Sequence, residues 1–217
     1  MHKSRGQDGF TLIEVLVTMA IFSVVSVGFY QLLFATTRGS RTAESVARVS
    51  EEARLGLNRL VRDAREASDV LSPTTTSYRI LVDFDGDGNM IGDAVPSDPA
   101  GNYEDLTVTW SQGAKTISLS NGVTTEVLMR GVDCVRKTDG TCQAMFTYSS
   151  SRLEYDTNGN GVTSATELDL APSLGNGNGV LDAQELNFVD GITYSFKVEH
   201  GDSDEDFYAE AQMRNQR

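Results

Sequence analysis

Histidine, cysteine and proline are scarce in this chain of 217 residues, which holds two histidines, two cysteines and four prolines. Two histidines and two cysteines leave little room for a zinc site or a histidine-dependent catalytic centre. So few prolines, together with 39% hydrophobic residues, exclude a collagen-like chain and a low-complexity disordered chain. The length fits one ordinary domain with an additional segment, or two small domains.

Positive charge is also in short supply, because 18 Lys and Arg residues oppose 31 Asp and Glu residues and give a formal net charge of −13. A general nucleic-acid binder needs a basic face for the phosphates, so we expect no nucleic-acid partner. Residues 1–72 hold nine basic and eight acidic side chains, whereas residues 73–217 hold nine and 23. The acidic part is therefore the C-terminal two-thirds of the chain.

Motifs of the common enzyme classes are missing from the sequence. It contains no glycine-rich phosphate loop, no Gly-x-Ser-x-Gly run and no zinc motif. His2 lies near the N-terminus and His200 stands alone in an acidic stretch, where it is most simply a solvated loop residue. We expect that the protein is not an enzyme; an enzyme carried on a membrane helix is the opposing hypothesis.

One long apolar run, FTLIEVLVTMAIFSVVSVGFYQLLFA at residues 10–35, contains a single charge at Glu14. As a helix it is roughly 39 Å long, which is enough to cross a bilayer core of about 30 Å. A secretory signal peptide has a shorter apolar region and ends in a small-residue cleavage site, which is missing here. A plain membrane anchor leaves Glu14 unexplained, because a carboxylate in hydrocarbon costs roughly 2.5–3.5 kcal/mol.

The run Gly-Phe-Thr-Leu-Ile-Glu at residues 9–14, followed by an apolar helix, resembles the signal of type IV pilins and pseudopilins. The resemblance implies that a membrane aspartyl peptidase cleaves between Gly9 and Phe10 and that Phe10 is then N-methylated. The apolar helix follows the cut and stays in the mature protein. Glu14, the fifth residue after the cut, matches the buried glutamate of the family. A carboxylate there can pair with the amine of Phe10 on a neighbouring subunit.

The resemblance also implies where the protein works. Basic residues flank the apolar run on both sides, so the positive-inside rule does not orient it. The peptidase of this family works at the cytoplasmic face, which implies a single-pass inner-membrane protein whose C-terminal domain lies in the periplasm and later in an extracellular pilus. The expected partners are the major pilin, other minor pilins, the prepilin peptidase and the inner-membrane assembly platform.

An amphipathic helix is predicted to continue the apolar one, up to Pro73. We expect one helix over residues 10–71. A coiled coil is the alternative, but strand-like segments follow and need a cover. Apolar side chains recur at steps of three and four, at Val46, Val49, Ala53, Leu57, Leu60, Ala64, Ala67 and Leu71.

The downstream segments predict an antiparallel sheet, with a tight hairpin turn at Asn121-Gly122. Candidate strands cover residues 78–82, 106–110, 116–119, 123–128, 144–148 and 192–198. The predicted fold class is α+β. The resemblance implies the type IV pilin fold, in which a long N-terminal helix, half transmembrane and half amphipathic, packs on an antiparallel β-sheet. The expected parts are a leader (1–9), an assembly helix (10–35), an amphipathic helix (36–72) and a β-rich head (73–217).

Three acidic loops predict calcium sites, because oxygen side chains at alternate positions converge when glycines allow a tight bend. In the first loop the candidate ligands are Asp83, Asp85, Asp87, Asn89 and Asp93. The second loop matches the twelve-residue calcium loop, with Gly161 at the turn. Its candidate ligands are Asp156, Asn158, Asn160, Val162, Ser164 and Glu167. Solvated turns without a metal are the alternative for all three loops.

The third loop repeats the second at an offset of 18 residues, with candidate ligands at Asn176, Asn178, Val180, Asp182 and Glu185. Leu174 stands where the first ligand is expected and cannot coordinate through its side chain. This site is therefore weaker or takes an oxygen from elsewhere, for which Asp169 is the candidate. The short offset leaves no room for the flanking helices of an EF-hand pair. We expect Ca²⁺ to staple the loops rather than to act as a signal.

Cys134 and Cys142 bracket a seven-residue segment that contains the turn signal Asp139-Gly140. In an oxidising periplasm, two cysteines this close predict one disulfide that closes a small loop. Two unrelated thiols are the alternative.

The particular role within the resemblance is a minor one, since the membrane helix lacks the proline of major pilins and the chain departs from their size. The arginine-bearing helix at residues 54–63 resembles both PilW-type minor pilins and the J-type pseudopilin of type II secretion. Two features lean toward the PilW type, namely the acidic loop at residues 83–89 and a final strand that ends Met213-Arg214-Asn215. We expect a minor pilin that initiates or caps pilus assembly, with the J-type pseudopilin and a tip adhesin as alternatives.

Overall fold

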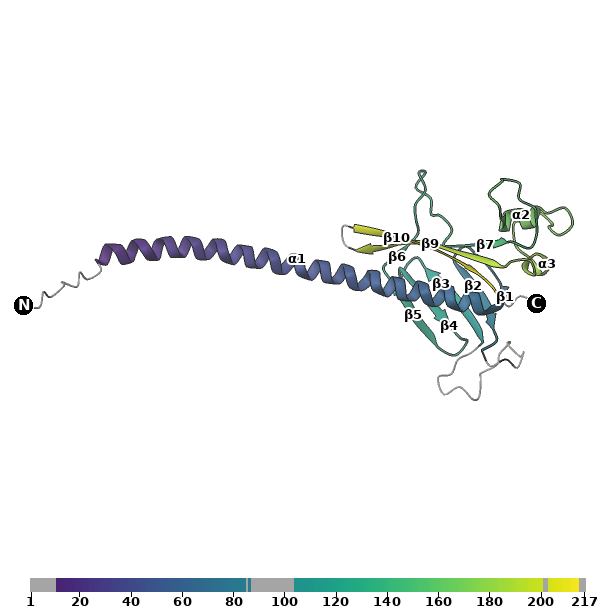
Figure 1. Cartoon of the computed structure of the whole chain (residues 1–217), viewed down its shortest axis with the longest axis horizontal. Coiled ribbons are helices and arrows are strands. Elements are labelled where there is room, and N and C mark those ends of the chain that lie inside the picture. Colours follow the sequence, from purple (N-terminus) through teal and green to yellow (C-terminus); the bar gives the residue numbers. More distant parts are fainter. Residues whose placement is uncertain (1–10, 85, 87–103, 201–202, 215–217) are drawn as a thin grey trace, which may run out of the picture. The chain divides into compact units, whose positions relative to one another are not determined.

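The structure, a computed structural model, describes residues 11–84, 86, 104–200 and 203–214. The chain divides into two compact units, Met1–Ala47 and Arg48–Arg217. One helix, α1 (Leu12–Glu66), contributes residues to both units. Figure 1 labels the helices and most of the strands, numbered in chain order.

In the first unit α1 is apolar and its side chains are exposed. Leu12–Arg38 has a mean hydropathy of 2.3 and is long and apolar enough to cross a membrane. The hydroxyl groups of Thr18, Ser23, Thr36 and Thr37 donate to carbonyl oxygens three or four residues earlier in the helix. These polar groups therefore need no water, which suits a helix surrounded by lipid.

Two antiparallel sheets make up most of the second unit. The first has the order β1-β2-β3-β4-β5, with strands Ala67–Leu71, Ser77–Val82, Asp105–Ser111, Thr116–Ser120 and Thr125–Arg130. The second has the order β10-β9-β7-β8, with β6 paired to β9 beside this path. Its strands are β6 (Val132–Asp133), β7 (Phe146–Ser150), β8 (Thr163–Ser164), β9 (Gly191–His200) and β10 (Ser203–Gln212). Two short helices, α2 (Ala165–Leu170) and α3 (Ala183–Leu186), lie between β8 and β9 in the chain.

Residues 48–66 of α1 lie over the strands of the first sheet (Figure 1). The predicted stripe from Ala53 to Ala64 is buried and belongs to one core with strands of both sheets. At Gly56 the helix comes closest to β5, because a Cβ added there would lie 2.5 Å from Cγ of Met129. The prediction of a helix packed on a sheet, rather than a coiled coil, is confirmed.

The prediction that the helix continues to residue 71 is wrong. The helix ends at Glu66, and Ala67–Leu71 form β1, which pairs antiparallel with β2. This strand buries Ala67 and Val70, and its register shifts between Ala67 and Asp69. A helical stripe and a bulged strand both bury Ala67, so residue spacing alone does not separate them; pairing with β2 decides the outcome.

The six predicted strands are present as β2, β3, β4, β5, β7 and β9, with ends shifted by up to two residues. The predicted hairpin turn joins β4 and β5, and the Asn121 carboxamide oxygen accepts the backbone N–H of Val123 and Thr124 at 3.1 and 2.8 Å. The strands β6 and β8 have two residues each, which is too short to produce an alternating apolar and polar pattern in the sequence. The helices α2 and α3 were not expected either, and each follows one of the acidic loops.

Two buried tyrosines connect the second sheet and the first sheet to α1. The hydroxyl oxygens of Tyr78 and Tyr194 lie 2.8 Å apart, and Tyr194 donates to the Leu60 carbonyl oxygen at 3.3 Å. Phe146 packs edge-on against both rings. Burial raises the pKa of each tyrosine hydroxyl far above the usual tyrosine value, so both hydroxyls stay protonated at neutral pH.

Replacing Tyr78 with phenylalanine should lower the free energy of unfolding by about 1 kcal/mol, because the buried Tyr194 hydroxyl loses one of its two hydrogen-bond partners and keeps the Leu60 carbonyl oxygen. Thermal unfolding of the full chain in detergent micelles, followed by near-ultraviolet circular dichroism, measures the effect. Tyr208→Phe is the matched control, since the Tyr208 side chain is exposed. Equal midpoints for Tyr78→Phe and the unmodified chain would contradict the role given to this hydrogen bond.

Candidate functional site

Glu14 lies in the first turn of α1, and its side chain is exposed on the apolar helix. It carries the one charge between residue 11 and Arg38. Its backbone is fully engaged, since the Glu14 N–H donates to Thr11 at 3.1 Å and the Thr18 hydroxyl donates to the Glu14 carbonyl oxygen at 2.9 Å. The predicted cleavage residues Gly9 and Phe10 lie outside the described residues.

The second acidic loop has the predicted ligand residues in register. Asp156 Oδ1 accepts the backbone N–H of Gly159 and Asn160 at 2.7 and 3.2 Å, and Oδ2 accepts Gly161 at 2.6 Å. The Asn158 and Asn160 carboxamide oxygens each accept an N–H two residues on. Gly161 has a φ of +87°, which an L side chain rarely adopts, so glycine is needed at this turn. The loop therefore turns its side-chain oxygens inward.

Glu167 closes this loop and lies in the first turn of α2. Its Oε1 accepts the Thr157 N–H and hydroxyl at 2.8 and 2.7 Å, and its Oε2 accepts the Ser164 N–H and hydroxyl at 2.9 and 2.8 Å. Ser164 and Glu167 form a capping box at the start of the helix. These donors lower the pKa of Glu167 to about 2, the Ser164 N–H contributing most. One carboxylate thus joins the first and last parts of the loop.

The third loop repeats this geometry. The Asn176 and Asn178 carboxamide oxygens accept N–H groups two residues on, at 3.0 and 2.8 Å. Glu185 accepts the Asn176 and Asp182 N–H groups at 3.3 and 2.9 Å, and Asp182 caps α3. Leu174 packs against the core instead of entering the loop.

Asp169, at the end of α2, occupies the place that Leu174 leaves open. Its Oδ1 accepts the Asn178 N–H at 3.1 Å, and its Oδ2 accepts the Gly179 N–H at 2.8 Å. In the second loop Asp156 accepts the equivalent N–H groups, those of Asn160 and Gly161, which lie 18 residues before Asn178 and Gly179. The structure therefore brings Asp169 into the third loop, in the position expected of a first ligand.

In the first loop the structure describes few of the predicted ligands. Asp83 Oδ1 accepts the Gly86 N–H at 2.6 Å. Asp85, Asp87, Asn89 and Asp93 lie outside the described residues. Glu104, which the sequence analysis did not single out, is fully buried beside this loop and accepts the Phe84 N–H at 2.8 Å. No local pattern marks Glu104 in the sequence, because its contact with residue 84 crosses 20 positions of the chain.

The donor set of the second and third loops suits a hard cation. Each loop supplies two or three carboxylates, amide oxygens and a backbone carbonyl, and calcium prefers six to eight oxygen ligands of these kinds. Among the described residues, three acidic, histidine or cysteine ligand atoms come close together at Asp133, Cys134 and Cys142. The two sulfur atoms there are bonded to each other, so this cluster is not a thiolate metal site.

Cys134 and Cys142 are joined by a disulfide with a Cα–Cα distance of 5.4 Å. Within the closed loop, Asp139 Oδ1 accepts the Thr141 N–H at 2.9 Å, and the Gly140 N–H donates to Lys137 at 2.9 Å. The predicted turn at residues 139–140 is therefore present. The oxidation state of the pair in the cell stays a prediction.

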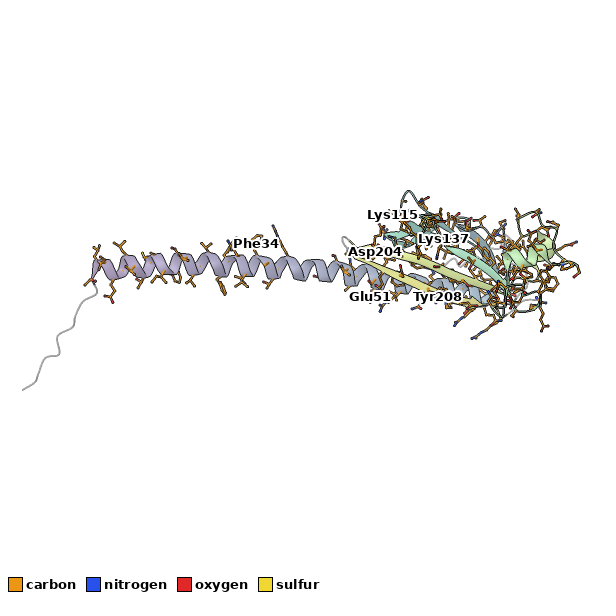
Figure 2. All side chains as sticks on the ribbon, turned by 90° about the horizontal axis from the view of Figure 1, so that it is seen from above. Phe34, Glu51, Lys115, Lys137, Asp204 and Tyr208 are labelled. Atoms are coloured by element: carbon orange, nitrogen blue, oxygen red, sulfur yellow. A yellow bond between two sulfur atoms is a disulfide. The ribbon has the colours of Figure 1, made fainter. Side chains whose placement is uncertain are left out.

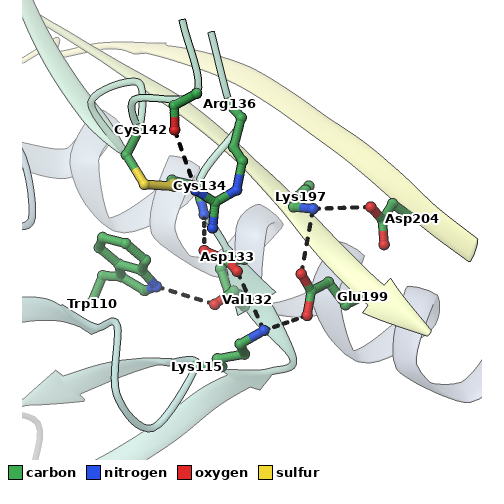
Figure 3. Close-up of polar contacts among 11 residues, drawn as sticks. Trp110, Lys115, Val132, Asp133, Cys134, Arg136, Cys142, Lys197, Glu199 and Asp204 are labelled. Atoms are coloured by element: carbon green, nitrogen blue, oxygen red, sulfur yellow. Dashed lines mark hydrogen bonds and ion pairs between the residues drawn. A yellow bond between two sulfur atoms is a disulfide. The ribbon is translucent and has the colours of Figure 1, made fainter. Parts of the chain in front are cut away.

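A network of ion pairs beside the disulfide links the two sheets (Figure 3). Lys115, in the turn between β3 and β4, contacts Asp133 at 3.3 Å and also pairs with Glu199 of β9. Lys197 extends the network to Glu199 and to Asp204 of β10, at 3.3 and 2.9 Å. Burial alone would raise the pKa of Asp133, but the Cys134 N–H and the Lys115 ammonium outweigh it and hold this pKa below its usual value.

Comparison with known proteins supports the reading of the N-terminus. The family model described as the prokaryotic N-terminal methylation motif matches residues 4–30. Among curated proteins, the chain is similar to Type II secretion system protein J of Vibrio cholerae serotype O1 (strain ATCC 39315 / El Tor Inaba N16961), with 53% identity over 48 residues. This match covers 22% of the chain and 22% of the relative, so it spans about a fifth of that protein's length. No solved structure matches the chain.

Residues 4–30 carry a prepilin-type N-terminal methylation motif, and this motif and the similarity to a pseudopilin are consistent with a type IV pilin-like protein. Its α+β arrangement, an apolar N-terminal helix with antiparallel sheets, is consistent with the pilin fold. The helix and the motif together fit a single-pass membrane-anchored protein.

Replacing Asp133 with asparagine should make the head less stable at neutral pH and leave acid stability unchanged. The lowered pKa of Asp133 stabilises the folded state at pH values above the unfolded pKa, about 3.9 for aspartate, and this contribution is lost as the pH falls through the lowered folded pKa. Unfolding midpoints of both chains in detergent should therefore differ at pH 7, and the difference should shrink as the pH falls below about 3.9. Asp69→Asn, on an exposed side chain of β1, is the control. A difference that does not depend on pH would contradict the ion-pair explanation.

Proposed function

We propose that this protein is a minor subunit of a type IV pilus, built into the filament through α1 after removal of residues 1–9. The observation that carries the proposal is Glu14, a lone carboxylate in an apolar helix at the start of a prepilin-type motif. In lipid a cation would stabilise this carboxylate. In this proposal the cation is the freed amine of Phe10 on a neighbouring subunit.

In this proposal the subunit initiates or caps assembly and is present in few copies. Its partners are the major pilin, other minor pilins, the prepilin peptidase and the assembly platform of the inner membrane. The head lies in the periplasm before assembly and outside the cell afterwards. The disulfide Cys134–Cys142 fits such an oxidising environment. Catalysis is no part of the proposal.

A second candidate is a J-type pseudopilin of a type II secretion system, which the similarity to the Vibrio cholerae protein favours. Both candidates use the same helix and the same carboxylate, so the two roles differ in the filament that receives the subunit. A third role, as an adhesin at the pilus tip, rests on the acidic loops, which a surface could contact.

Glu14→Ala should still insert into the membrane but should enter filaments at least about tenfold less often, because a neighbour's amine loses its partner. Immunoblots of membrane and sheared-filament fractions measure both steps. Glu14→Asp keeps the charge and is the matched control, with partial incorporation expected. The mature chain should begin at Phe10 by intact mass. A mature chain that starts after residue 35, or wild-type incorporation of Glu14→Ala, would overturn the assembly role.

Deleting the gene separates the two filaments. Loss of surface pili with normal protein secretion supports the pilus subunit, whereas retained pili with secreted proteins trapped in the periplasm support the pseudopilin. Complementation with the Glu14→Ala chain should fail in either case.

We also propose that the acidic loops bind Ca²⁺ and that the ion holds them in their folded form. Supporting observations are the repeated geometry of the second and third loops and the burial of Glu167, Asp169 and Glu185. Buried carboxylates are costly unless charges or hydrogen bonds compensate, and a divalent cation adds the strongest compensation available to oxygen ligands. The ion would supply structural cross-linking of each loop and no chemistry.

Asp156→Ala and Asp169→Ala should each remove one bound calcium ion from the full chain, because each would supply the first ligand of its loop. Metal counting after dialysis against calcium in detergent measures this, with the exposed Glu154→Ala as control. Binding to the folded state should raise the free energy of unfolding by roughly 2.7 kcal/mol at a hundredfold excess over Kd. No bound calcium and equal midpoints with calcium and with chelator would mean that the loops are solvated turns.

A further inference from the structure

The two sheets end in strands that differ sharply in regularity. In the first sheet, β1 has a register shift between Ala67 and Asp69, and the pairing of β5 with β4 shifts at Ile117/Ser118. In the second sheet, β8 has two residues. By contrast, β10 pairs with β9 through ten consecutive residue pairs with no shift. Bulged or very short edge strands resist pairing with another chain, whereas a long regular edge invites it.

The outward edge of β10 keeps its backbone groups available. Within the described part of the chain, no backbone hydrogen bond joins residues 203–212 to any element other than β9. Glu205 belongs to the other row of β10 side chains and contacts α1. Ser50 donates a hydrogen bond to the Glu205 carboxylate at 2.6 Å, and Arg54 forms an ion pair with it at 2.9 Å. A hollow of about 530 Å³ beside the end of the strand is lined by Glu210 and Gln212 together with Arg65, Met213 and Arg214.

The outward row of β10 combines acid with an aromatic ring. Asp204, Asp206 and Glu210 alternate along it with Tyr208, whose side chain is 70% exposed. Figure 2 labels Asp204 and Tyr208 along this strand. Asp204 already pairs with Lys197, while no ion pair joins Asp206 or Glu210 to another described residue. Exposed tyrosines are enriched where proteins bind one another.

The charges indicate what fits this edge. A second copy of the chain would place acidic rows of the same sign side by side, which is unfavourable for directly opposed pairs. We propose that the free edge of β10 binds an extended segment of a different protein as an added strand, and that this segment carries Lys or Arg at alternate positions. Backbone hydrogen bonds hold the segment, its basic side chains lie beside Asp206 and Glu210, and its aliphatic stems pack on Tyr208.

Binding at β10 can be tested independently of the assembly role of α1, because the measurement needs no filaments. The probe is a nine-residue peptide of alternating lysine and threonine, added to the full chain in zwitterionic micelles. Hydrogen exchange should slow by at least about tenfold at outward amides within residues 203–212. Glu210→Lys should weaken binding by about tenfold, the value of one well-placed charge pair. The control Glu154→Lys changes the net charge equally at an exposed site outside β10 and should weaken binding less than Glu210→Lys does.

Two N-methylated peptides distinguish an added strand from general attraction of charge. One has methyl groups on the odd amides and the other on the even amides, and an added strand uses one of these two rows. Binding by one methylated peptide and not by the other supports the proposal. Equal binding by both, unchanged exchange over residues 203–212, equal losses for Glu210→Lys and Glu154→Lys, or no binding at millimolar peptide would each overturn it.

Discussion

The close packing of α1 on the head is the contact on which the rest of the fold depends. Gly56 lets the helix approach β5, since a side chain there would collide with Met129 and with the carbonyl of Leu128. Ion pairs then fasten both flanks of the helix: Arg59 and Glu52 reach Glu126 and Arg130 on β5, and Arg54 reaches Glu205 on β10. Surface pairs contribute little each, so burial of the apolar stripe supplies most of the stability and the charges fix the register.

The negative charge of the acidic side chains is compensated in two ways. Around Lys115 they meet a cation and join the two sheets. In the second and third loops they meet backbone N–H groups instead, and each of Asp156, Glu167, Asp169 and Glu185 accepts at least two. The first arrangement needs contacts between strands that are distant in the chain, whereas the second is local. This difference explains why the loops can repeat as a sequence unit.

Local patterns predicted the parts of the fold that local physics decides. The stripe from Ala53 to Ala64 has a helical period, and the Asn-Gly turn and the register of the second loop need few neighbours. Where distant contacts decide, sequence spacing was insufficient. Residues 67–71 fit a helix until β2 pairs with them, and the buried position of Glu104 depends on a partner 20 residues away. Asp169 was suspected from the defect at Leu174, but its contacts with Asn178 and Gly179 could be found only in three dimensions.

The acidity of the head has a consequence for assembly. Residues 73–217 carry an excess of 14 negative charges, counted as 23 acidic and nine basic residues. Heads of this kind repel one another when they are adjacent, and the repulsion is strongest at low salt and at distances within the Debye length of about 8–10 Å. The net charge of the heads therefore opposes contact between identical copies, whereas the apolar helices favour it. We infer that the chain is better suited to lie among less acidic subunits than to form a filament with itself, which agrees with a subunit used in few copies.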